Sequence, residues 1–150
     1  MSCDENNFYV TVVSGWRDQA DVTSITQKLN AEPGIVAENV ITNCNAPVDS
    51  TANTARKAMD DLDTVKCGDL LLVVMRQKNY SYAGTFALIG AALVLGKPVV
   101  ILCPGKVWIN GDDGLQYTHD CQQNEFYWHN KAERVSSFEE ALGAINSWRS

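Results

Sequence analysis

Short apolar runs alternate with stretches of helical periodicity along the whole chain. Runs rich in Val, Ile and Leu predict strands, because such side chains suit a pleated, buried surface. These runs cover 8–13, 35–41, 69–75 and 99–102, and a last short strand ends at Val135. Between them, apolar residues recur every three or four positions and predict helices over 21–30, 51–67, 83–95 and about 138–148.

Polar residues and glycines mark the ends of these helices. The candidate caps are Asp21, Ser50 or Thr51, Gly68 and Gly96. The last helix follows a Ser-Ser-Phe-Glu-Glu segment at 136–140, which contains the Ser-x-x-Glu capping box in two overlapping registers. In the second helix we expect one apolar face, formed by Ala55, Met59, Leu62 and Val65.

This alternation predicts an α/β fold with an open parallel sheet of about five strands and helices on both faces. Right-handed connections make it a doubly wound, flavodoxin-like sheet. The run at 69–75 is apolar on both faces, as is typical of a central strand covered by helices. We find no internal repeat and expect one domain over 1–150. The Gly- and Asp-rich segment 104–123 is predicted to be a loop, and a loop of this length suggests a functional segment.

In such a sheet, ligands bind outside the carboxyl ends of the strands. The segments expected there are 14–19, 42–50, 76–85 and the residues after Leu102. The first offers a hydroxyl, an unhindered backbone, an aromatic face and a guanidinium, which would suit a base or a phosphate. These groups belong to Ser14, Gly15, Trp16 and Arg17. A plain turn with a surface Trp–Arg stack explains them equally well.

Two further groups of residues could contribute to a site. Gly84 and Thr85 begin the third helix, where free amides and the helix dipole favour an anion; simple helix capping is the alternative. Three acids, Asp60, Asp61 and Asp63, lie near the end of the second helix and oppose its dipole, although a solvated acidic face also explains them.

Composition narrows the possible partners. The 150-residue chain has 18 acidic and 12 basic residues and a formal net charge of −6, which argues against binding to nucleic-acid polymers. No window is apolar enough to span a membrane, and the polar N-terminus does not resemble a secretory signal. Five scattered cysteines point to reduced thiols and a cytoplasmic location. The spacing of cysteines and histidines predicts no metal site, and we expect no cofactor.

Three segments resemble nucleoside 2-deoxyribosyltransferases and their superfamily relatives. Residues 61–69, followed by an apolar strand, are similar to a helix-to-strand segment of the family. Residues 84–99 resemble its G-[ST]-x-x-E-[IL]-G-x-A-x-x-x-x-K-P-V segment. The tail, with 124–126, His129 and 135–141, is similar to the end of superfamily relatives.

The resemblance implies a flavodoxin-like fold, a homo-oligomer, and cleavage of the N-glycosidic bond of nucleosides or nucleotides by transfer or hydrolysis. It also implies a Glu nucleophile on the third helix, which forms a covalent glycosyl-enzyme. Leu88 stands at that position, and 86–99 contains no carboxylate. Asp61 matches an acid that the family uses near the sugar and base, and Tyr82 lies where many transferases have an acid just before the Gly.

Three interpretations follow. The favoured one is a protein that binds a nucleoside or nucleotide through Ser14–Trp16, Asp61, Tyr82 and Gly84–Thr85 but lacks covalent glycosyl transfer. The second is an active N-glycosidase or deoxyribosyltransferase with a relocated carboxylate, for which Asp61 is the candidate. The third is an oligomeric interaction module, with the aromatic tail 126–129 as interface. The sequence therefore leaves open whether the protein is an enzyme.

Overall fold

The computed structural model describes residues 6–42, 51–77, 82–103, 108–110, 116–118 and 129–149. Its strands in the main sheet are β1 (Phe8–Gly15), β2 (Ile35–Thr42), β3 (Leu70–Val74), β4 (Val99–Leu102) and β7 (Ala132–Val135). Its helices are the 3-10 helix η1 (Trp16–Asp18), α1 (Gln19–Asn30), α2 (Thr51–Cys67), α3 (Ala83–Val94) and α4 (Phe138–Arg149).

The five strands form one parallel sheet in the order β2-β1-β3-β4-β7. β1 therefore lies between β2 and β3, and the chain reverses its direction of winding after β2. This order confirms the predicted flavodoxin-like α/β fold. It also places the carboxyl ends of β1, β2 and β3 side by side at one edge of the sheet.

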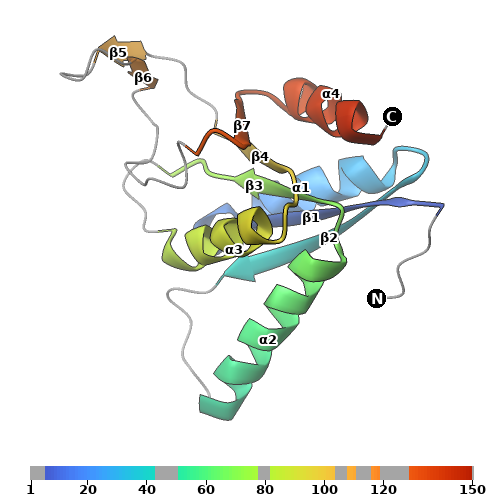
Figure 1. The fold of residues 1–150 in the computed structure, drawn as a ribbon, viewed down its shortest axis with the longest axis vertical. Helices are drawn as coiled ribbons and strands as arrows, with labels where there is room; N and C mark the ends of the chain where they lie inside the picture. The colour runs from blue at the N-terminus through green and yellow to red at the C-terminus, as the bar shows by residue number, and fades with distance from the viewer. Residues whose placement is uncertain are drawn as a thin grey trace.

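Helices cover both faces of the sheet (Figure 1). Successive strand side chains point to opposite faces, so β3 contributes Leu72 to one core and Val73 to the other. The first core includes α1 and α4, and the second includes α2 and α3. The predicted central strand is buried at every position of β3, which explains its apolar character on both faces.

The last helix uses one of its two predicted capping registers. The backbone N–H of Glu140 donates to Ser137 Oγ at 3.1 Å, which caps α4. The Glu140 carboxylate accepts from the backbone N–H of Ser136, the residue before the cap, at 3.0 Å, whereas the return bond of a capping box goes to the cap residue itself. The register that begins at Ser137 therefore provides the cap of α4.

The start of α1 differs from the prediction. The helix begins at Gln19, two residues before the expected cap Asp21, because η1 already turns the chain after β1. The side chain of Asp21 pairs instead with Arg76, with 3.0 Å between Oδ2 and Nε. A salt bridge across the edge of the sheet takes the place of the expected cap.

The apolar face predicted for α2 is buried at one of its positions and exposed at the others. Val65 is buried, but Ala55 is exposed and Met59 and Leu62 are 66% and 47% exposed. The beginning of α2 projects away from the sheet (Figure 1).

The predicted loop 104–123 contains a second, small sheet. β5 (Trp108–Asn110) and β6 (Gln116–Thr118) pair in antiparallel fashion. The sequence pattern missed these strands because each has only three residues, too few to show alternation.

Over the described ranges, no helix is long and apolar enough to cross a membrane. In the same ranges, no three His, Cys, Asp or Glu side chains gather as metal ligands would.

Candidate functional site

Two threonines join three elements at the carboxyl edge of the sheet. The Thr42 hydroxyl, at the end of β2, donates to the backbone carbonyl of Ser14 on β1 at 3.1 Å. Since that bond uses the only hydroxyl hydrogen of Thr42, Thr85 donates to Thr42 Oγ1 across 3.0 Å. Thr85 is in the first turn of α3, and all three residues are buried. The predicted residues Ser14 and Thr85 therefore lie in one cluster.

Gly84 has a packing role at this cluster. A Cβ added to Gly84 would lie 2.9 Å from Thr42 Cβ and 3.2 Å from its Cγ2, which is closer than side chains tolerate. Only glycine allows the start of α3 to approach the end of β2 this closely. The structure thus gives Gly84 a steric reason, whereas its predicted part in holding an anion stays a prediction.

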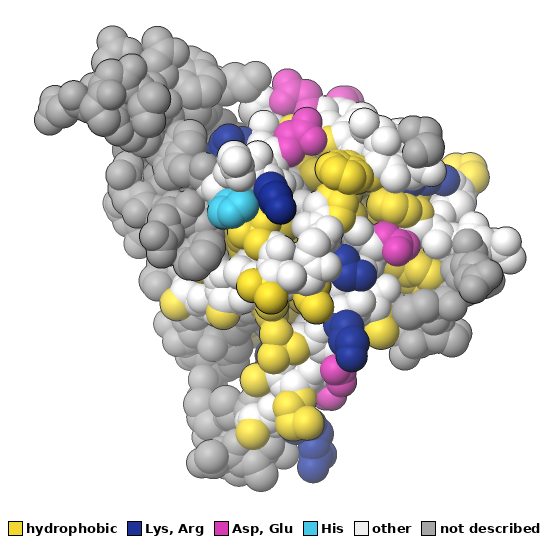
Figure 2. All heavy atoms as spheres, viewed as in Figure 1, with side chains coloured by type: hydrophobic (Ala, Val, Ile, Leu, Met, Phe, Trp, Pro, Cys, Tyr) yellow, Lys and Arg dark blue, Asp and Glu magenta, His cyan; other side chains and the backbone are white. Residues whose placement is uncertain are grey.

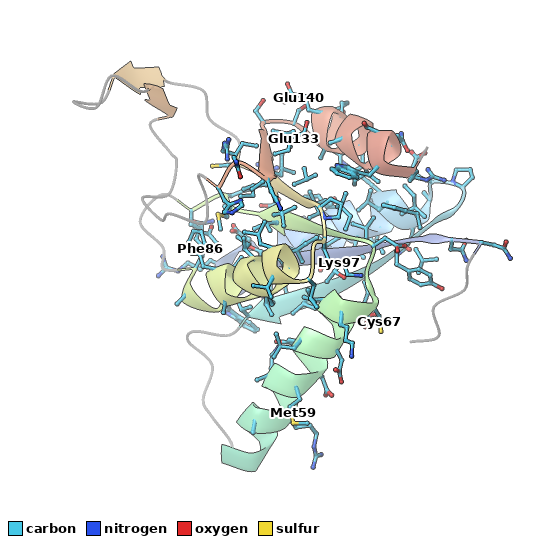
Figure 3. All side chains as sticks on the ribbon, in the orientation of Figure 1. Met59, Cys67, Phe86, Lys97, Glu133 and Glu140 are labelled. Atoms are coloured by element: carbon cyan, nitrogen blue, oxygen red, sulfur yellow. The ribbon has the colours of Figure 1, made fainter. Side chains whose placement is uncertain are left out.

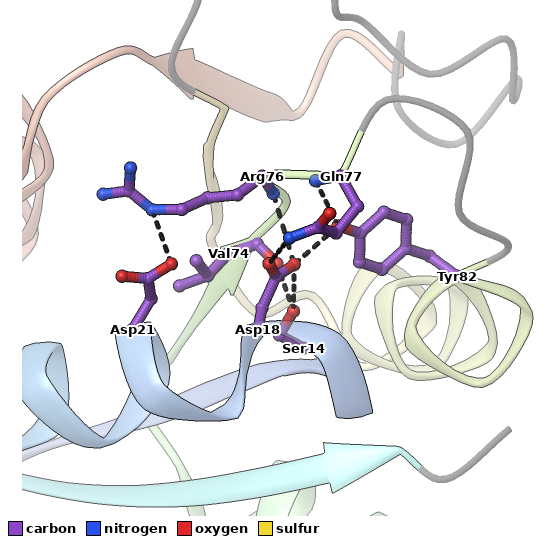
Figure 4. Close-up of polar contacts among 7 residues, drawn as sticks. All are labelled: Ser14, Asp18, Asp21, Val74, Arg76, Gln77 and Tyr82. Atoms are coloured by element: carbon purple, nitrogen blue, oxygen red, sulfur yellow. Dashed lines mark hydrogen bonds and ion pairs between the residues drawn. The ribbon is translucent and has the colours of Figure 1, made fainter. Parts of the chain in front are cut away.

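Asp18 lies at the centre of the site, although no pattern in the sequence identified it. Its side chain is 1% exposed and accepts hydrogen bonds from three groups (Figure 4). The Tyr82 hydroxyl donates to Oδ2 at 2.5 Å, and Gln77 Nε2 donates to Oδ1 at 3.1 Å. The backbone N–H of Arg76 donates to Oδ2 at 3.2 Å. Ser14 Oγ lies 3.1 Å from the same oxygen, but its one hydrogen is donated to the backbone carbonyl of Val74. A buried carboxylate needs such donors, and here they come from the residues after β3 and from Tyr82 just before α3.

The only sequence signal for Asp18 is its place in the segment 14–19 after β1. An acidic residue there is ordinary in a loop, and its burial depends on three partners more than 55 residues away. Local pattern therefore could not identify it.

Tyr82 connects Asp18 to Gln77 in this hydrogen-bond network. Its hydroxyl donates to Asp18 and accepts from the backbone N–H of Gln77 at 2.8 Å. Burial, together with the hydrogen bond to Asp18, raises the pKa of the Tyr82 hydroxyl well above its ordinary value of 10.0. Tyr82 therefore remains a neutral donor at physiological pH.

Trp16 and Arg17 form the rim of the site. Both belong to η1, directly after the buried end of β1 at Gly15. The Trp16 side chain is 44% exposed, and Arg17 is exposed as well. An indole face at the mouth of a polar cluster can stack on a planar ring.

Leu88 lies beneath the threonine cluster. It follows Thr85 by three residues, so both lie on the same face of α3. Leu88 is 5% exposed and packs in the core that includes Phe86, Ile89 and Tyr82. The position at which the sequence resemblance predicts a nucleophile thus presents an apolar side chain to a hydrophobic environment.

Asp61 stands apart from this network in the described residues. It lies on α2, and its Oδ2 pairs with Lys57 Nζ at 2.8 Å, one turn earlier on the same helix. No hydrogen bond within the described ranges joins Asp61 to Ser14 or Asp18. Its predicted role at a sugar stays a prediction, as does any contribution from 43–50 or 119–128, which lie outside the described residues.

No family model matches this sequence, and no curated protein matches it. Two solved structures are similar to the fold. One is a 2-deoxyribosyltransferase from Bacillus psychrosaccharolyticus, with a TM-score of 0.60, 13% identity, and coverage of 91% of this chain and 95% of that one. The other is a 2-deoxyribosyltransferase from Leishmania mexicana, with a TM-score of 0.55, 15% identity, and coverage of 92% and 97%. Along almost its whole length, the chain therefore has the fold of these two transferases.

Proposed function

We propose that this protein binds a nucleoside or nucleotide at the carboxyl edge of its sheet and lacks the covalent glycosyl-transfer step. The single observation that carries the proposal is the buried Leu88 in an apolar core, directly below the Ser14–Thr42–Thr85 cluster. Leucine has no lone pair with which to attack an anomeric carbon. The fold shared with two 2-deoxyribosyltransferases supports a nucleoside as the class of ligand.

The remaining described groups suit binding better than attack. The Asp18 carboxylate already accepts three hydrogen bonds, so its lone pairs are largely occupied. The exposed indole of Trp16 offers a stacking surface for a base. Thr85, Ser14 and Thr42 shape a polar floor, but their hydroxyl hydrogens already serve protein acceptors.

Calorimetric titration with a panel of ribo- and deoxyribonucleosides and their 5′-monophosphates tests the proposal. We expect saturable binding of at least one compound without release of its base. Trp16→Ala should weaken that binding about tenfold, as losing one aromatic stack would. Val94→Ala, an exposed apolar side chain at the end of α3 and away from the carboxyl edge of the sheet, is the control. Absence of binding across the whole panel would contradict the proposal.

A second candidate function is an active N-glycosidase or deoxyribosyltransferase that uses Asp61. The observation in its favour is the ion pair with Lys57, which fixes the orientation of the Asp61 carboxylate on α2. This candidate requires base release by the wild-type protein and its loss in Asp61→Asn, with the exposed Asp63→Asn as control. Chromatography of reaction mixtures distinguishes the two candidate functions, because only an active glycosidase or transferase releases a free base.

We further propose that the protein associates with itself through α2. Met59 and Leu62 are large apolar side chains that remain exposed there, and a second copy could bury them. The same surface would support the third interpretation, an oligomeric interaction module. Light scattering of the wild type and of Leu62→Lys tests it: the variant should have a lower mass. The scattered cysteines support a cytoplasmic location for such an assembly.

A further inference from the structure

A hollow of about 590 Å³ lies at the amino edge of the sheet, opposite the candidate site. Lys97 and Pro98 directly precede β4, and Ala132 begins β7, so both strands enter the sheet at this hollow. The Ser14–Thr42–Thr85 cluster lies at the other ends of the parallel strands. The two sites are therefore separated by the length of the sheet. The volume of the hollow is within the range of cavities that hold small organic molecules.

The lining combines an apolar floor with one aromatic face. Leu93, Pro98 and Ala132 provide the floor, and Trp148, near the end of α4, provides the face. Trp148 is 56% exposed, which is unusual for the largest apolar side chain. Figure 2 shows apolar side chains next to Lys and Arg side chains on this face. A flat ring could lie against the indole and remove both surfaces from water.

Charge identifies the ligand more closely. Lys97 and Lys131 both line the hollow, and within the described residues neither ammonium group forms an ion pair. Glu133 is the single described acid in the lining, so the described lining carries a net positive charge in a chain whose overall charge is −6. Figure 3 places Lys97 beside α3 and Glu133 on β7. Two cations beside an apolar floor attract an anion that also carries a ring.

We propose that this hollow is a second binding site, which accepts a small planar aromatic acid. The ring lies against Trp148 over Leu93 and Pro98, and the anionic group lies between Lys97 and Lys131. The Asn130 side chain, which also lines the hollow, adds a hydrogen-bond donor for the same group. This site is independent of the nucleoside site, because it uses none of the residues at the carboxyl edge.

Titration with 2-naphthoate, followed by calorimetry and by backbone amide NMR, tests the proposal. The matched probes are 2-naphthylmethanol and 2-naphthylmethylammonium, which keep the ring but lose or invert the charge. We expect 2-naphthoate to bind most tightly and to shift the amides of 93–98 and 130–133. Lys131→Glu and Trp148→Ala should each weaken binding about tenfold. Lys66→Glu, an equally exposed charge reversal on α2, should leave it unchanged.

Three results would overturn the proposal. The first is equal binding of the neutral and anionic probes, and the second is amide shifts confined to the carboxyl edge. The third is a lower solution mass for Trp148→Ala, which would make this face an interface between copies of the chain. Both variants alter exposed side chains, so their circular dichroism spectra should match the wild type and exclude misfolding as the cause. Because nucleosides bind at the other edge in the proposed function, their failure to bind would not affect this result.

Discussion

At the scale of single residues, the site depends on a few side chains whose partners are far away in sequence. Asp18 is buried because Tyr82, Gln77 and Arg76, which lie between β3 and α3, supply hydrogen-bond donors. An unpaired carboxylate in that position would cost several kcal/mol, so these three bonds make its burial possible. Leu88 shows the opposite case, since an apolar, buried residue occupies the position where the sequence resemblance predicts an acid.

Leu88→Glu tests what this single position decides. Introducing a carboxyl group into the apolar core should lower the free energy of unfolding by about 2–5 kcal/mol. If the nucleoside site is otherwise intact, base release from a deoxynucleoside should appear or increase. Chromatography measures the released base, and urea unfolding measures the stability.

Leu88→Gln is the matched control, because glutamine has nearly the same shape as glutamate but cannot act as a carboxylate nucleophile. Equal base release by the Glu and Gln variants would contradict a nucleophilic role for this position.

Tyr82→Phe tests the hydrogen-bond network around Asp18. The variant removes the donor to Asp18 Oδ2 and leaves the backbone N–H of Gln77 without its acceptor. We expect the free energy of unfolding to fall by about 1–3 kcal/mol. Urea denaturation measures the change.

A double-mutant cycle with Asp18→Asn isolates the direct interaction, and the two losses should fail to add by at least about 0.5 kcal/mol. The same cycle between Asp18→Asn and the distant Ser137→Ala should be additive. Additivity in the first cycle would show that the tyrosine and the carboxylate act independently.

Gly84→Ala tests the close approach of α3 to β2. A new Cβ would lie 2.9 Å from Thr42 Cβ, so the helix start or Thr42 must move. We expect a loss of about 1–3 kcal/mol in thermal or urea unfolding.

Gly90→Ala is the matched control on the same helix, since nothing lies within 4 Å of its added Cβ. It should raise stability by up to about 1 kcal/mol, because alanine favours a helix interior. A destabilisation of the same size at both positions would indicate that general helix effects, and not the contact with Thr42, explain the loss.

At the scale of elements, local pattern predicted the helices and strands that pack in the core. β4 has the predicted bounds, and α2 begins and ends close to its prediction. Apolar periodicity predicts which residues share a face but not whether that face has a partner, and Met59 and Leu62 are exposed in the structure. The three-residue strands β5 and β6 were missed, since pairing and not periodicity defines them.

Ser137→Ala tests the cap of α4. The variant removes the oxygen that accepts from the Glu140 backbone N–H. We expect a loss of about 1 kcal/mol, which thermal unfolding should detect as a lower Tm. Ser24→Ala, at an exposed position inside α1, is the comparison and should change the Tm little. Equal shifts in the two variants would contradict a capping role for Ser137.

At the scale of the whole molecule, the doubly wound sheet brings the ends of β1, β2 and β3 to one edge. The switch in winding direction after β2 opens this edge between helices on the two faces. The amino ends of β4 and β7 form the other edge, where the 590 Å³ hollow lies. The fold thus offers two separate surfaces for ligands, and the side chains at each edge determine what binds there.

Alkaline pH should destabilise the molecule through Tyr82. Its pKa is raised in the folded protein, whereas the unfolded chain releases the same proton near pH 10. The stabilisation is therefore complete below pH 10 and decreases as the pH rises above that value, by up to about 1.4 kcal/mol per pH unit. Urea unfolding between pH 8 and 11 measures this slope. Tyr82→Phe should show a shallower slope, and identical slopes would contradict the assignment.

Local pattern was enough to predict the order of strands and helices and the parallel sheet, because apolar periodicity depends on residues close in the chain. The absence of an acid on α3 is likewise read directly from 83–94. The partners of Asp18, the steric need for Gly84 and the exposure of apolar residues on α2 came from the folded molecule alone. Each of these depends on which distant segments meet, and that is set by packing across the sheet.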